Sequence, residues 1–134
     1  MIKQELKVFL VVGVLTVLVD FCTYRLILWL LQSNVSIAKG VSFFVGTVFA
    51  YWANRRFTFK VQKPMRGDVV RFALVYLISL GLNVGINTLV LHGVGRTQIT
   101  LLIAFVLATG VSAAFNFIGM KWFAFRTKSS ENAA

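Results

Sequence analysis

The sequence is poor in charged residues, above all in acidic ones. Of its 134 residues 13% are charged, and only 4 are Asp or Glu against 14 Lys and Arg. A water-soluble domain carries about 25% charged residues, whereas here 58% of the residues are hydrophobic. Too little charge is present to cover the surface of a soluble domain, so we expect lipid to cover much of this one.

Cysteine, histidine and proline are each present once. The single Cys22 excludes an intramolecular disulfide and a metal site built from several cysteines. A lone His92, with no phosphate-binding Gly-rich loop and no paired carboxylates, leaves hydrolytic or transferase chemistry without its parts. We therefore expect no enzyme, no cofactor and no bound metal. Pro64 lies in a connection between apolar segments.

Four long apolar segments dominate what is there. They cover about 6–31, 35–53, 69–91 and 99–120. Each is close to the roughly 20 residues that a helix needs to cross a bilayer core of about 30 Å. The sequence predicts an all-α integral membrane protein with four transmembrane helices.

Basic residues gather at the ends of these segments. A net charge of +10 can indicate a nucleic-acid partner, but here the cations do not follow one polar face, so we expect none. Because cytoplasmic connections are rich in Lys and Arg, both termini and the middle connection are predicted to be cytoplasmic. Arg96 alone lies on the opposite side. The cytoplasmic side carries Lys3, Lys7, Arg55, Arg56, Lys60, Lys63, Arg66, Arg71, Lys121, Arg126 and Lys128.

The two halves of the chain match. Phe9 corresponds to Phe72 at a spacing of 63, and Phe59 corresponds to Phe125 at a spacing of 66. The sequence predicts a single membrane domain, 1–134, built from two two-helix repeats at about 6–60 and 69–126, followed by a polar tail at 127–134. Each repeat has two helices, so the repeats are predicted to be parallel, related by an axis along the membrane normal.

Polar residues recur on one face of each segment. They are expensive at membrane depth and usually face protein or water, so they serve either packing or binding. For the small ones, packing is the simpler interpretation. Asp20 is the strongest functional candidate, because its match in the second repeat is the uncharged Asn83. The matched stripes are Gly13, Thr16, Asp20 and Tyr24, and Tyr76, Ser79, Asn83 and Asn87.

Two cations, Arg25 and Lys39, flank the otherwise uncharged first connection. Each could extend to the lipid headgroups. Alternatively, the two together could hold a phosphate, Arg by its planar fork and Lys as a point charge.

Several motifs together resemble the GtrA-like family of small four-helix membrane proteins. They are "FLVVGVLTVLVDF", "FAYWANRRFTF", "RFALVYLISLGLN" and "AAFNFIGMKWFAF", and they extend over about residues 5–127. The N-R-[RK]-[FW]-x-F pattern that begins at Asn54 is the most specific. In the second copy Met120 takes the place of that Asn.

The resemblance implies translocation of a polyprenyl-phosphate-linked sugar, such as undecaprenyl-phosphate glucose, across the bacterial cytoplasmic membrane for O-antigen or other surface polysaccharides. We expect the lipid-linked sugar, membrane lipids, a membrane glycosyltransferase and further copies of the chain as partners. A scaffold for a glycosyltransferase and a small proton-coupled drug exporter are the alternatives. In our interpretation Arg55 and Arg56 meet the phosphate inside, and Arg25 and Lys39 meet it outside. The sugar would contact Asp20, Asn83, Asn87 and Asn116, and Asn54 is included as a motif position.

Overall fold

The structure is a computed structural model that describes residues 1–32, 34–63 and 65–125. The chain divides into two compact units, and the boundary falls between Lys63 and Pro64. Each unit is a pair of helices followed by a short π-helical turn. The first unit holds α1 (Ile2–Leu31), α2 (Val35–Ala53) and η1 (Asn54–Thr58), and the second holds α3 (Asp68–Val94), α4 (Gln98–Gly119) and η2 (Met120–Ala124).

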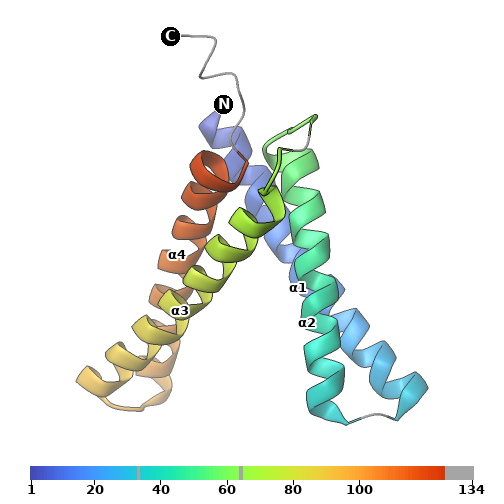
Figure 1. Cartoon of the computed structure of the whole chain (residues 1–134). Helices are drawn as coiled ribbons and strands as arrows, with labels where there is room; N and C mark the ends of the chain where they lie inside the picture. The colour runs from blue at the N-terminus through green and yellow to red at the C-terminus, as the bar shows by residue number, and fades with distance from the viewer. Residues whose placement is uncertain (33, 64, 126–134) are drawn as a thin grey trace. The chain divides into compact units, whose positions relative to one another are not determined.

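In each unit the two long helices lie side by side as a hairpin (Figure 1). We call them hairpin one (α1–α2) and hairpin two (α3–α4). A polar residue starts the second helix of each hairpin, as expected for N-caps. The side chain of Asn34 accepts a hydrogen bond from the Ser36 amide at 2.8 Å, and Thr97 forms a capping box with Thr100. These caps fix where each connection ends and the return helix begins.

Small side chains allow α1 and α2 to approach closely, as predicted. The buried face of α2 contains Ala38, Ser42, Gly46 and Ala50, spaced four apart. In α4 the corresponding face contains Ala104, Ala108 and Ser112. Association of membrane helices depends on such small residues because lipid tails remove the hydrophobic drive between helices.

The two hairpins bury several matched positions. Val12 and Val75, 63 positions apart, are both buried, as are Ser42 and Ala108, 66 positions apart. The turns η1 and η2 are also 66 positions apart. Hairpin two gains its three additional residues at the start of α4, because the N-caps Asn34 and Thr97 still differ by 63. The two hairpins thus share these spacings, and the repeat bounds predicted from the sequence stay a prediction.

Most large apolar side chains on these helices are exposed, among them Val17, Phe44, Leu77 and Phe105. The described residues contain four helices long and apolar enough to cross a membrane. Contiguous apolar surface on this scale requires lipid or protein cover. The chain is therefore a multi-pass membrane protein.

Candidate functional site

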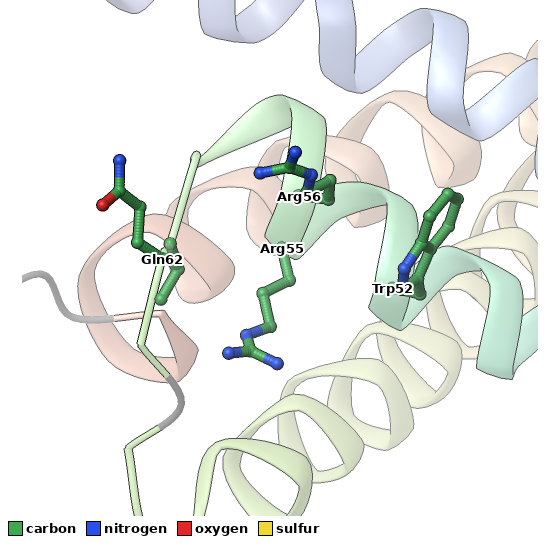
Figure 2. A pocket seen from close by; sticks show the side chains of 5 residues that line it. Trp52, Arg55, Arg56 and Gln62 are labelled. Atoms are coloured by element: carbon green, nitrogen blue, oxygen red, sulfur yellow. The ribbon is translucent and has the colours of Figure 1, made fainter.

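A pocket of about 470 Å³ lies at the end of hairpin one where α2 runs into η1. Its lining comes from the last turn of α2, from η1 and from the segment after it. Figure 2 shows the side chain of Arg55 between those of Trp52 and Gln62, which lie on opposite sides of it in this view. The lining residues are Trp52, Arg55, Arg56, Val61 and Gln62.

The backbone after η1 folds back to form this pocket. Lys60 adopts a left-handed conformation (φ 51°), which is uncommon for a residue with a side chain. That turn lets the amide of Val61 donate to the carbonyl of Arg55 at 2.9 Å. Gln62 is thereby returned to the side of the arginines. Because this turn forms the pocket, all lining residues fall within one short stretch of the sequence, 52–62.

A hydrogen-bonded pair holds η1 from inside. Asn54 is buried, its Nδ2 donates to the carbonyl of Ala50 at 2.9 Å, and its Oδ1 accepts from the Thr58 hydroxyl at 2.9 Å. Both atoms of its side-chain amide are therefore hydrogen-bonded to residues four positions away on the same helical segment. Isolated π-helical turns occur frequently at functional sites, and here the turn directs Arg55 and Arg56 outward. A binding role for Asn54 itself stays a prediction.

The pocket carries uncompensated positive charge. Among the described residues, those lining it include two arginines and no Asp or Glu. The Nε of Arg55 is buried without a hydrogen-bond partner in the described part of the chain. A buried donor without a partner costs about 1–3 kcal/mol. The arrangement therefore suits an oxyanion, to which arginine can donate two parallel hydrogen bonds.

Asp20 and Lys39, predicted separately, lie together in hairpin one. The Lys39 ammonium Nζ is 2.7 Å from Asp20 Oδ2, and the Ser42 hydroxyl donates to Asp20 Oδ1 at 2.6 Å. The same ammonium lies 6.0 Å from the centroid of the Tyr24 ring. Lys39 therefore directs its charge into the hairpin. Arg25 is exposed, and the structure gives no contact between it and Lys39.

The predicted asparagines of hairpin two are only partly brought together. Asn83 Nδ2 donates to the Ser112 hydroxyl at 3.0 Å. One turn further along α4, the Oδ1 of Asn116 is buried without a hydrogen-bond partner among the described residues. Asn87 is partly buried and lies one turn from Asn83 on α3. Their roles toward a sugar stay predictions.

Sequence reasoning missed three lining residues, Trp52, Val61 and Gln62. Trp52 lies within the motif "FAYWANRRFTF", which assigns it no separate role, and its ring contacts Phe57 edge-on at 5.3 Å between centroids. Gln62 gave no signal, because its position depends on the left-handed turn at Lys60. That turn could not be expected at a lysine.

Comparison with known proteins identifies the family. The model of the GtrA/DPMS transmembrane domain matches residues 8–125. The chain belongs to this family. The uncharacterized membrane protein YwcD of Bacillus subtilis (strain 168) is 23% identical over 127 residues, which cover 92% of this chain and 98% of that protein. No solved structure matches the chain.

Family membership agrees with the sequence resemblance over nearly the same residues. The matched family is a transmembrane domain, and the match extends over both hairpins and both π-helical turns. The relative carries no assigned activity in its name. The substrate must therefore be argued from the geometry.

Proposed function

We propose that this GtrA-family protein moves a polyprenyl-phosphate-linked sugar across the bacterial cytoplasmic membrane. The observation that supports this most is the arginine pocket, lined by Arg55 and Arg56 at the end of an apolar helix. A ligand for it must combine an anion with a tail that stays in lipid. A lipid phosphate meets both requirements.

The remaining lining suits a sugar. Trp52 is 54% exposed and offers an aromatic face, and the amide of Gln62 can both donate and accept hydrogen bonds. Sugar hydroxyls need such groups once the headgroup leaves water. Under the predicted orientation this pocket opens to the cytoplasm, where the headgroup would enter, and Asp20 lies farther along hairpin one. Contacts of the sugar with Asn83, Asn87 and Asn116 of hairpin two stay predictions from the sequence.

The test is leaflet transfer by the pure protein. Full-length protein is reconstituted into liposomes that contain a fluorescent polyprenyl-phosphate glucose, and an impermeant quencher reports the outer-leaflet fraction over time. Replacing Arg55 and Arg56 together by Gln should abolish the transfer, because each lost charge-assisted contact weakens phosphate binding by about 1.5–3 kcal/mol, or roughly 10- to 150-fold.

The matched control removes the same charge nearby. Lys63 and Arg66 are exposed cations in the same connection and do not line the pocket, so their double replacement by Gln should leave transfer unchanged. If folded native protein moves no lipid, the proposal is wrong and the scaffold for a glycosyltransferase gains support. Equal loss in both double variants would show that bulk charge, and not the pocket, matters.

A further inference from the structure

The ion pair between Asp20 and Lys39 changes what Lys39 can offer an anion. The carboxylate has both oxygens occupied, one by the Lys39 ammonium and one by the Ser42 hydroxyl. The side chain of Lys39 is still 57% exposed. An ammonium has three N–H donors, so an incoming phosphate could contact Lys39 while Asp20 keeps its own bond.

Hairpin two shows that the ion pair is not needed to hold two such helices together. There Asn83 stands at the position of Asp20 and donates to Ser112 at 3.0 Å. Phe105 stands at the position of Lys39. Charges at membrane depth are expensive, and the uncharged version supports the same buried face. The charges in hairpin one therefore call for a role beyond packing.

The ion pair and the arginine pocket lie near opposite ends of α2. Lys39 and Arg55 are 16 positions apart, which corresponds to about 24 Å along a helix that rises 1.5 Å per residue. One phosphate cannot touch both. A lipid headgroup that crosses the membrane beside hairpin one would therefore meet them in succession, as two stations.

The two stations differ in charge. The pocket offers two guanidinium groups with no lining carboxylate among the described residues, whereas the charge of Lys39 is balanced by Asp20. A path for ions or headgroups needs a site strong enough to admit the ligand and another weak enough to release it. The unequal charges provide this difference along a single helix.

We propose that Asp20 sets the anion affinity of the Lys39 station, keeping it low so that a lipid-linked phosphate bound at the arginine pocket is released at the other end of hairpin one. Asp20 is on this view a positioning residue that acts through Lys39. The inference rests on the proposed function, and it goes further by assigning capture and release to named groups.

A binding measurement tests it without requiring transport. The probe is a short-chain isoprenyl-phosphate glucose, added to purified full-length protein whose pocket is disabled by Arg55→Gln and Arg56→Gln. In this background Asp20→Asn should tighten binding by up to about five-fold, the effect of freeing one ammonium from a partly exposed pair. Adding Lys39→Gln to Asp20→Asn should return binding to the weak level.

Glu5→Gln is the matched control, because it removes a carboxylate from the first turn of α1, far from Lys39 in the hairpin. It should not tighten binding. With the pocket intact, Asp20→Asn should bind the probe more tightly yet transfer long-chain lipid more slowly at saturation, which is the signature of delayed release.

Two results would overturn the inference in different ways. If native protein binds and transfers the lipid but Asp20→Asn leaves binding unchanged or weaker, Asp20 is a structural staple and the proposed function stands. If neither native protein nor any variant binds the probe, the proposed function fails together with the inference.

Discussion

At the residue scale, Gly46 determines how closely α1 and α2 can approach. A Cβ added there would lie 3.2 Å from the Cβ of Asp20 and 3.5 Å from the Thr16 carbonyl oxygen. We expect Gly46→Val to separate the helices, weaken the bond between Ser42 and Asp20, and destabilise the protein by about 1–3 kcal/mol. Unfolding of the detergent-solubilised protein measures this change.

Gly40 provides the control on the same helix. A Cβ there meets no atom within 4 Å, and glycine inside a helix costs about 0.5–1 kcal/mol relative to alanine. Gly40→Ala should therefore be neutral or stabilising. Equal stability of Gly40→Ala and Gly46→Val would contradict the packing argument.

Asn116 presents the opposite situation, a polar group without a partner. Its Oδ1 is buried and unpaired among the described residues, and hairpin one carries Ala50 at the matched position. Asn116→Ala should keep or raise stability, because an unsatisfied buried acceptor costs about 1–3 kcal/mol. If the amide binds sugar, transfer should fall in the same preparation.

Both quantities are needed from that one variant. A clear loss of stability would mean that the amide has a structural partner after all. Full stability with full transfer would remove Asn116 from the candidate site. Asn83→Ala is the useful comparison, since it breaks an observed bond to Ser112 and should lower stability.

The ion pair between Asp20 and Lys39 could have been predicted from the charges of the two residues, but not from their spacing within each helix. Asp20 and Lys39 both lie within apolar segments, and opposite charges at membrane depth usually pair with each other. The pairing depends on the register of α1 against α2, which the small-residue face of α2 sets. Without that register, Lys39 was predicted to serve a phosphate together with Arg25.

At the element scale, the π-helical turns are the feature that the sequence did not reveal. The matches at spacings of 63 and 66 predict a repeated unit, and η1 and η2 are also 66 positions apart. A π turn has hydrogen bonds that span five residues, as from the Phe59 amide to the Asn54 carbonyl at 2.9 Å and from the Phe125 amide to the Met120 carbonyl at 2.8 Å. In η1 the bond between Asn54 and Thr58 stabilises it, whereas η2 has Met120 and Ala124 at those positions, both buried.

This contrast predicts a non-additive pair of substitutions. Asn54→Met alone would leave the buried Thr58 hydroxyl unpaired, and Thr58→Ala alone would leave the Asn54 oxygen unpaired, each at about 1–3 kcal/mol. The double variant has the residues of η2 at both positions. Its loss of unfolding free energy should be smaller than the sum of the losses of the two single variants. A double-mutant cycle of unfolding free energies measures the coupling, expected at about 0.5–3 kcal/mol.

The cycle also has a result that would contradict it. Additive losses would mean that Asn54 and Thr58 act independently, and that the η1 geometry is held by other contacts. Probe binding gives a second measurement, because the pocket depends on the same turn. In the double variant we expect the turn to hold Arg55 and Arg56 in the same place. Most of the probe binding should therefore remain.

At the scale of the whole molecule, the number and order of helices followed from hydrophobicity alone. The apolar segments 35–53 and 99–120 agree closely with α2 and α4 (Gln98–Gly119). The first helix is predicted from residue 6, but α1 begins at Ile2, because Lys3, Gln4 and Glu5 are good helix formers although they are not apolar. Hydropathy marks the membrane-embedded part of a helix, not its full length.

Orientation is the prediction that joins these scales, since it decides which leaflet the arginine pocket serves. Eleven of the 14 Lys and Arg residues lie on one predicted side and one on the other, so that side should be cytoplasmic. Single cysteines at Gln4 and Met65 on that side, and at Ser36 and Gln98 on the other, keep every charge in place in a background with Cys22→Ser. In intact cells an impermeant thiol reagent should label only Ser36→Cys and Gln98→Cys, and all four after the membrane is opened. Labelling of Gln4→Cys or Met65→Cys from outside would show that the orientation is the opposite of the predicted one. The arginine pocket would then face the outer leaflet as a site of release or uptake.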